Sequence, residues 1–172
     1  MEKFEIHMHS TFSDGEFSPT KLVDIAKNNG VSTLCLTDHD TFGGIDEFIP
    51  AAEAEGIFAF SGIEITVRYR GFNLHLLAYF ESADSLSEEL CREVRGMADK
   101  REKRMRELII RINEVIPEKF RGTIEFENVR RAAEGVLARP HLAKEMARLG
   151  IVANSRDAFD RYLVKYNVER KN

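Results

Sequence analysis

The stretch KFEIHMHSTFSDGEFSPTKLVDIAKNNGVSTLCLTDHD, residues 3–40, decides the fold class. Its first eight residues alternate apolar and polar side chains, as a half-buried strand does. Residues 18–30 then show helical spacing, with Ser18 as a candidate N-cap and Pro19 at the first helical position. Residues 31–40 form a nearly continuous apolar run that stops at charged residues, as a strand buried on both faces does. This strand–helix–strand order predicts an α/β fold with parallel strands.

The alternation of helices and strands continues after residue 40. Residues 43–56 are expected to be helical, but Pro50 inside them predicts a kink or a division into two short helices. Residues 57–69 and 72–80 predict two more strands. We therefore expect four parallel strands whose carboxyl ends meet at one edge, where α/β folds build their sites.

The pattern changes at about residue 84, after which no strand is expected. Ser85 and Glu88 make a candidate capping box at the start of a long helix. Three shorter helices are predicted after that helix. The sequence therefore predicts an α/β part, residues 1–82, followed by an all-helical lobe, residues 83–172.

Composition narrows the class of protein. The chain has 172 residues, 43% of them hydrophobic, which is enough for one domain with a sizeable core and an inserted lobe. The formal net charge of −4 gives no indication of a nucleic-acid partner, and we predict no stable binding of duplex nucleic acid. Two isolated cysteines form neither a disulfide framework nor a zinc pattern. The N-terminus carries no leader pattern and no apolar run approaches the ~20 residues of a membrane span, so we predict a cytoplasmic protein without a membrane partner.

Six metal-ligating side chains lie on or just after the predicted strands. They are His7, His9, Asp14, His39, Glu64 and His75. The first two share one face of a strand, on the order of 6.6 Å apart along it. Polar residues flanked by large aliphatic residues on a strand face something other than packed core, and a buried carboxylate or histidine is costly unless it is paired or metal-bound. These residues together predict a metal site.

Individual members of this set have simpler explanations. His75 alone, in an apolar strand, would more often be a satisfied core histidine. His39 lies between two aspartates and fits a charged turn. As a set, imidazole and carboxylate groups suit Zn²⁺, Fe²⁺ or Mn²⁺, and ions bridged by Glu64 would generate a hydroxide nucleophile and neutralise charge on a phosphate or carbonyl oxygen.

The chain resembles the PHP family (polymerase and histidinol phosphatase) of metal-dependent phosphoesterases. The resemblance rests on HMHSTFSDG, CLTDHDT, GIEIT and LHLLAY, in the family's order and spacing. SDGEFSPTKLV, LTDHDTFGG and ARPHLAKEM resemble the bacterial branch that acts on nucleotide 3′,5′-bisphosphates and short 5′-ended RNA. Polymerase PHP domains have a glycine where this chain has Asp40.

The resemblance implies a distorted (β/α)₇ barrel, of which this chain holds the first four strands, with a helical insertion. It also implies up to three divalent ions, with Mn²⁺ favoured over Zn²⁺ or Fe²⁺. By position, the three ions would be held by His7, His9 and Glu64; by Glu64 and His75; and by Asp14 and His39. No catalytic residue beyond these metal ligands is assigned.

The resemblance places Arg139 and His141 of ARPHLAKEM near the substrate phosphate. An arginine suits this role because its forked donors match phosphate oxygens. The simpler interpretation is a helix start, with Arg139 solvated. Arg101, in a basic helical run, is expected on the apolar side of its helix, either snorkelling past its neighbours or clamping a phosphate.

The family continues for roughly a hundred residues beyond the last motif and supplies further ligands there, whereas this chain has no histidine after His141. The chain is therefore expected to be C-terminally truncated. We predict a phosphoesterase that hydrolyses the terminal phosphate of a nucleotide 3′,5′-bisphosphate or a short 5′-ended oligoribonucleotide. The alternatives are a catalytically incomplete metal-binding or structural module, and a phosphatase for another small monoester such as histidinol phosphate.

Overall fold

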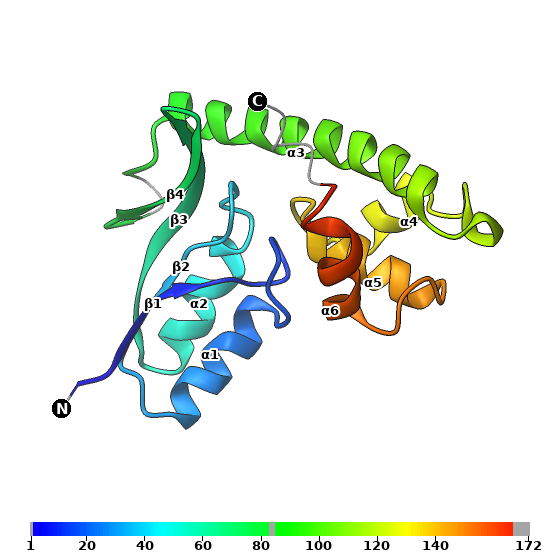
Figure 1. Cartoon of the computed structure of the whole chain (residues 1–172). Helices are drawn as coiled ribbons and strands as arrows, with labels where there is room; N and C mark the ends of the chain where they lie inside the picture. The colour runs from blue at the N-terminus through cyan, green and yellow to red at the C-terminus, as the bar shows by residue number, and fades with distance from the viewer. Residues whose placement is uncertain (1, 83–84, 167–172) are drawn as a thin grey trace. The chain divides into compact units, whose positions relative to one another are not determined.

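The computed structural model describes residues 2–82 and 85–166 (Figure 1). The elements follow the predicted order of strands and helices, and then helices alone. They are β1 (Phe4–Met8), α1 (Pro19–Asn28), β2 (Thr33–Leu36), α2 (Ile45–Ala54), β3 (Phe58–Tyr69), β4 (Phe72–Phe80), α3 (Glu88–Val115), the 3₁₀ turn η2 (Glu118–Phe120), α4 (Phe126–Arg131), α5 (Arg139–Arg148), α6 (Ser155–Ala158) and the π-helical turn η3 (Phe159–Leu163). A half-barrel sheet followed by helices confirms the predicted fold class.

The four strands form one sheet in the order β1-β2-β3-β4. β1 pairs with β2, and β2 with β3, in parallel, whereas β3 and β4 are antiparallel. The expectation of four parallel strands was therefore wrong for β4. Only two residues, Arg70 and Gly71, join the last two strands, and both have positive φ, 49° and 85°. A two-residue turn of this kind makes a hairpin, since a parallel connection needs a dozen or more residues.

Both helices of the α/β part follow from local sequence. α1 begins as expected, with the Ser18 hydroxyl accepting a hydrogen bond from the Lys21 amide at 3.3 Å. α2 is a single helix that contains Pro50, so the expected division into two short helices was wrong. Pro50 has no amide hydrogen to donate to the Asp46 carbonyl one turn earlier, and both residues are exposed, so that carbonyl lies where solvent can reach it.

The chain has two separate clusters of buried apolar side chains. In the first, the helices α1 and α2 pack on one face of the sheet (Figure 1), and the cluster comprises Val23, Ala26, Leu34, Leu36, Phe48, Ala52 and Ile57. In the second, the C-terminal half of α3 packs against the helices that follow it; its fully buried members include Ile112, Val129, Leu142, Met146 and Leu163.

The chain divides into two compact units, residues 1–98 and 99–172, and the division falls inside α3. The predicted boundary between residues 82 and 83 lies before that helix and stays a prediction. Ser87, rather than Ser85, caps α3, because its hydroxyl accepts a hydrogen bond from the Leu90 amide at 3.1 Å. Among the described helices, none has the length and apolar character to cross a bilayer.

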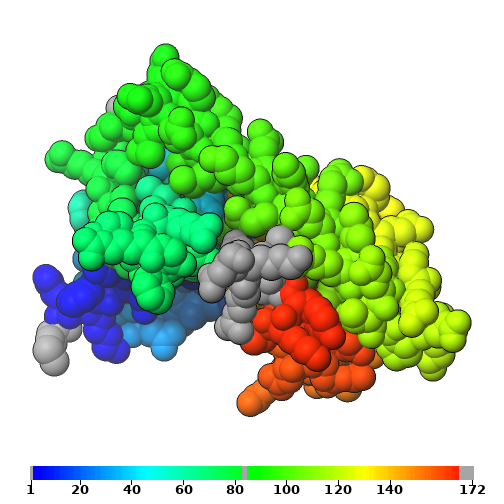
Figure 2. Space-filling model, turned by 45° about the horizontal axis from the view of Figure 1, so that its top comes forward, coloured from blue at the N-terminus to red at the C-terminus, as the bar shows by residue number. Residues whose placement is uncertain are grey.

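The hairpin of β3 and β4 lies at the surface of the α/β unit, where its blue-green to green atoms are visible in Figure 2. Several apolar side chains of β4 are exposed, among them Phe72, Leu74 and Leu76. These residues alternate with Asn73 and His75 along the strand, so His75 projects from the opposite face of the sheet.

Candidate metal centre

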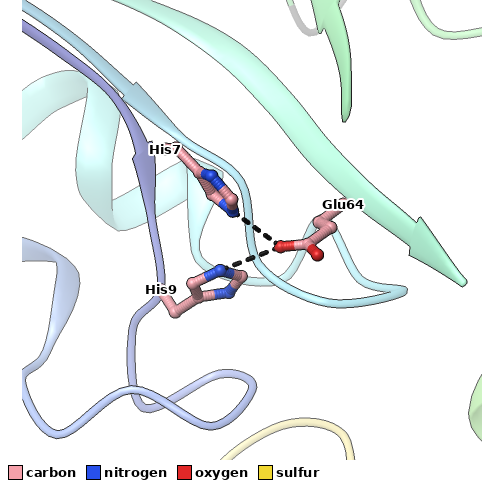
Figure 3. A group of neighbouring side chains, drawn as sticks. All are labelled: His7, His9 and Glu64. Atoms are coloured by element: carbon pink, nitrogen blue, oxygen red, sulfur yellow. Dashed lines mark hydrogen bonds and ion pairs between the residues drawn. The ribbon is translucent and has the colours of Figure 1, made fainter. Parts of the chain in front are cut away.

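Glu64, from the middle of β3, is the centre of a cluster of imidazoles. Its side chain is only 6% exposed. His7 Nε2 and His9 Nε2 lie 2.8 and 3.0 Å from the same carboxylate oxygen, Glu64 Oε2 (Figure 3). His75 Nδ1 lies 2.5 Å from the other oxygen, Glu64 Oε1. The carboxylate therefore bridges imidazoles that come from two different strands.

Strand geometry explains why these groups meet. His7 belongs to β1 and His9 follows its end, two residues further on the same face. His75 pairs with Thr66 across the β3–β4 ladder, so it is the diagonal neighbour of Glu64 on one face of the hairpin. The hydroxyl of Tyr79 on β4 donates a hydrogen bond to the Ile6 carbonyl on β1 at 3.1 Å, which shows how strongly the sheet curves.

Asp14 and His39 extend the cluster on its other side. His39 forms an isolated parallel bridge with Glu64, and its Nδ1 lies 3.8 Å from Glu64 Oε2. Asp14 Oδ2 is 3.8 Å from His39 Nε2, and Asp14 Oδ1 is 3.7 Å from His9 Nδ1. All six side chains named from the sequence are thus brought together, in three overlapping groups: His7, His9 and Glu64; His9, Asp14 and His39; and His39, Glu64 and His75.

The four imidazoles form a continuous row. The ring centroids are 5.2 Å apart for His7 and His9, 4.5 Å for His9 and His39, and 4.8 Å for His39 and His75. Four protonated rings this close would repel one another, and the two carboxylates of Glu64 and Asp14 could not balance four cations. Neutral imidazoles are good metal ligands, and the row favours a site that holds cations.

The electrostatics of Glu64 agree with this view. Burial raises its pKa, whereas its contacts with the surrounding histidines lower the pKa by more, and the net pKa lies below the ordinary value. In the described part of the chain, every ion-pair partner of Glu64 is an imidazole. The lowered pKa favours the ionised form of the carboxylate, which is the form that binds a cation.

The donor geometry fits divalent ions. Two ligands that each lie ~2.1 Å from one ion are roughly 3.0–3.4 Å apart, close to the His7–Glu64 and His9–Glu64 separations. The Nδ1 atom of His9 is buried and has no hydrogen-bond partner among the described residues, and Asp14 is its nearest carboxylate. His7 and His75 are 48% and 49% exposed in their side chains, so the cluster is open to a substrate on that side.

Two aspartates that sequence reasoning treated as a charged turn are buried beside this cluster. Asp38 and Asp40 flank His39 and are 2% and 1% exposed. Burial raises the pKa of Asp38 above its ordinary value, although hydrogen bonds from Ser10 and Ser13 act against it. The serines of HSTFSDG, four and one residues before Asp14, were the available signal, since their hydroxyls are natural carboxylate donors.

Arg139 and His141 belong to the helical unit, and their role at the substrate phosphate stays a prediction. Arg139 is exposed at the start of α5, with its guanidinium 5.7 Å from the Phe159 ring centroid. His141 is buried, and its Nδ1 accepts a hydrogen bond from the Ala138 amide at 3.0 Å, which caps α5. Arg101 donates a hydrogen bond to the Leu137 carbonyl at 3.4 Å.

Comparison with known proteins places this geometry in context. The family model described as the PHP domain matches residues 5–163. The chain is 35% identical over 163 residues to a 5′-3′ exoribonuclease of Haemophilus influenzae, covering 94% of this chain and 57% of that protein. It is 28% identical over 165 residues to a 3′,5′-nucleoside bisphosphate phosphatase of Chromobacterium violaceum, covering 95% of this chain and 55% of that protein. The chain thus spans about half the length of the curated relatives it matches.

Solved structures agree with the sequence matches. A protein from Bifidobacterium adolescentis predicted to be a metal-dependent phosphoesterase superposes with a TM-score of 0.80 at 27% identity, over 93% of this chain and 55% of that one. An amidohydrolase from Chromobacterium violaceum, solved with sulfate and without metal, superposes with a TM-score of 0.82 at 25% identity, over 99% of this chain and 58% of that one.

Proposed function

The chain belongs to the PHP domain family, and on that premise we propose that the whole protein is a metal-dependent phosphoesterase acting on terminal phosphates of nucleotides or short RNA. The observation that carries the proposal is the Glu64 carboxylate, which is buried and shared among imidazoles from two strands and two loops. A buried carboxylate so placed is costly unless a cation completes the site.

The proposed ligands are the six clustered side chains. They are His7, His9, Asp14, His39, Glu64 and His75. Divalent ions bound there would supply a hydroxide nucleophile at neutral pH and neutralise charge on the phosphate. We favour Mn²⁺, with Zn²⁺ and Fe²⁺ as alternatives, because imidazole and carboxylate ligands suit all three. We also propose a cytoplasmic location, on cysteine usage alone.

The distribution of charge supports a polyanionic substrate. Residues 1–98 carry 7 Lys and Arg against 17 Asp and Glu, whereas residues 99–172 carry 18 against 12. The overall charge of −4 is therefore the sum of +6 in the helical unit and −10 in the α/β unit. A basic unit attached to a metal site favours substrates with several phosphates, such as a bisphosphate or a short RNA, over a lone monoester.

A substrate panel with added Mn²⁺ tests the proposal. Phosphate release is measured from a nucleoside 3′,5′-bisphosphate, a 5′-phosphorylated short RNA and histidinol phosphate. We expect turnover of one of the first two, loss of that turnover in Glu64→Ala, and retention of it in Glu53→Ala, a control at an exposed position of α2. Full activity in Glu64→Ala would overturn the bridging role of this carboxylate, and a preference for histidinol phosphate would move the substrate to another class.

As a second function we propose a metal-binding or structural module without catalysis, which would use the same cluster of six side chains. Elemental analysis separates the two proposals. Bound metal with no turnover of any substrate in the panel would support the module, and turnover would exclude it.

A further inference from the structure

We infer that Asp38 and Asp40 are positioning residues, which hold three ligand-bearing segments at fixed distances from one another. The inference rests on the proposed metal centre, because it assigns what keeps that centre in shape. Both aspartates flank His39, and both are almost completely buried. A charged turn would leave them in water, whereas a buried carboxylate persists only where hydrogen bonds satisfy it.

Asp38 fastens the loop that follows β1. Its Oδ1 accepts hydrogen bonds from the Ser10 amide at 2.7 Å and from the Ser13 hydroxyl at 2.5 Å, and its Oδ2 accepts one from the Ser10 hydroxyl at 2.5 Å. Ser10 directly follows His9, and Ser13 directly precedes Asp14. The Asp38 carboxylate, just after β2, therefore holds one residue next to His9 and one residue next to Asp14.

The loop itself is built to receive this carboxylate. The Ser13 and Gly15 amides both donate hydrogen bonds to the Ser10 carbonyl, at 3.0 and 2.9 Å. A Cβ atom on Gly15 would lie 2.0 Å from the His9 carbonyl oxygen, so only glycine allows the chain to turn this closely. This tight turn aims the two serine hydroxyls at Asp38 and leaves His9 and Asp14 facing His39.

Asp40 fastens β3 on either side of Glu64. Its Oδ1 accepts a hydrogen bond from the Thr66 amide at 2.7 Å, and its own amide donates to the Glu64 carbonyl at 3.1 Å. The Glu64 amide in turn donates to the Asp38 carbonyl at 3.2 Å. β2 ends at Leu36, so these contacts extend its pairing with β3 to the position of the bridging carboxylate.

The backbone conformation of Asp40 is one that glycine adopts more easily. Its φ is +50°, in the left-handed region that favours glycine. A glycine would adopt this φ without strain but would offer no acceptor to the Thr66 amide. The Asp40 side chain therefore supplies a contact to β3 that glycine at this φ would lack. The two aspartates thus act in opposite directions from His39, one on the β1 loop and the other on β3.

Two variants of Asp40 separate the effect of its backbone conformation from the effect of its hydrogen-bond acceptor. Asp40→Gly keeps the φ and loses the acceptor, whereas Asp40→Asn keeps the acceptor and tolerates the φ. Mn²⁺ affinity is measured by calorimetry and the ligand geometry by the visible absorption of bound Co²⁺. We expect Asp40→Gly to lose ~10–100-fold in Mn²⁺ affinity and to change the Co²⁺ spectrum, as loss of residues that orient metal ligands does, and Asp40→Asn to match wild type. Wild-type affinity and spectrum in Asp40→Gly would overturn the inference for Asp40.

Ser13→Ala tests Asp38 with a small change, because it removes one hydroxyl donor and leaves the Ser10 contacts in place. We expect a several-fold loss of Mn²⁺ affinity with an unchanged far-ultraviolet circular dichroism spectrum, and unchanged affinity would overturn the role of Asp38. Failure of the wild-type protein to bind Mn²⁺ or Co²⁺ at all would instead refute the proposed metal centre. The two failures are therefore distinguishable.

Discussion

The α/β unit and the helical unit each bury a carboxylate, but they satisfy it differently. In the helical unit, Glu145 is 5% exposed, and the Arg148 guanidinium donates to both of its oxygens, at 2.6 and 2.7 Å. In the α/β unit, Glu64 is buried to the same extent, and its ion-pair partners among the described residues are all imidazoles. A carboxylate paired with a guanidinium is complete, whereas one surrounded by titratable rings is suited to a further cation.

The histidines repeat the contrast. His141 is buried in the helical unit, and its ring closes a hydrogen bond within its own helix turn. His9 keeps a buried ring nitrogen without a hydrogen-bond partner among the described residues. Burial of a polar residue is therefore a poor sign of a site by itself. The informative sign is a group of buried polar side chains that come together from several segments and do not satisfy one another's hydrogen bonds.

Replacement of Glu64 and of Glu145 by glutamine, in separate variants, gives the largest expected difference. Glu64→Gln removes the negative charge shared by the imidazoles, and we expect Mn²⁺ affinity to fall by ~100-fold or more and phosphatase turnover to fall to background. Glu145→Gln removes an equally buried charge from the helical unit, and we expect unchanged Mn²⁺ affinity with a lower midpoint of thermal unfolding. Equal losses of Mn²⁺ affinity in the two variants would break the contrast.

Alkaline pH should destabilise the α/β unit selectively. Burial raises the pKa of the Cys35 thiol from 9.0 to about 12, and residues 99–172 contain no cysteine. Because the folded pKa is the higher one, the thiol's contribution to stability is fully present below pH 9 and is lost as the pH rises toward 12. The expected slope approaches about 1.4 kcal/mol per pH unit in that window.

The measurement is urea unfolding at pH 8 to 11, followed by circular dichroism and by thiol labelling. Cys35→Ala should start from a lower stability at pH 8, because it leaves a small cavity, and should show a shallower decline above pH 9. An equally steep decline in Cys35→Ala would assign the alkaline loss to other groups.

The sequence predicted the α/β class and the clustering of the six side chains because both depend on local periodicity. Alternation places His7 and His9 on one face of β1, and the apolar neighbours of Glu64 mark it as the polar exception in its strand. The direction of β4 was predictable in principle from the two-residue link Arg70-Gly71. The antiparallel direction of β4 was missed because the parallel arrangement expected for the first three strands was assumed for the fourth as well.

The hydrogen bonds of Asp38 and Asp40 could not be predicted from the periodicity of the sequence. The charged turn TDHD gives no indication that its two carboxylates find donors 25 to 28 residues away, in Ser10, Ser13 and Thr66. Those contacts exist only after two strands and a loop are assembled. Similarly, the helical interpretation of ARPH was correct for α5, but the burial of His141 and its hydrogen bond to the Ala138 amide required the packed unit.

His141 distinguishes a structural histidine from a substrate-contacting one. His141→Ala removes the acceptor for the Ala138 amide, and we expect a loss of about 1–2 kcal/mol in the free energy of unfolding. Gln is a natural residue at this capping position, so His141→Gln should restore most of that stability. Urea unfolding measures both variants. A stable His141→Gln variant with unchanged kcat/KM supports a purely structural role, and a stable variant with reduced kcat/KM would support the predicted contact with the phosphate.

We expect the smallest effect from the difference in net charge between the two units, measured as a change in KM. Lys100 and Lys103 are exposed on the part of α3 that belongs to the basic unit, and Arg92 and Arg95 are exposed on the same helix within the acidic unit. If the basic unit attracts a phosphorylated strand, Lys100→Glu with Lys103→Glu should raise KM for a 5′-phosphorylated short RNA by roughly 3- to 10-fold at low salt, and Arg92→Glu with Arg95→Glu should leave it nearly unchanged. Screening should remove the difference at ~0.5 M salt, where charges more than a few ångströms apart no longer interact. Equal effects of the two charge reversals would mean that net charge of the whole chain, rather than its separation into two units, governs the approach of substrate.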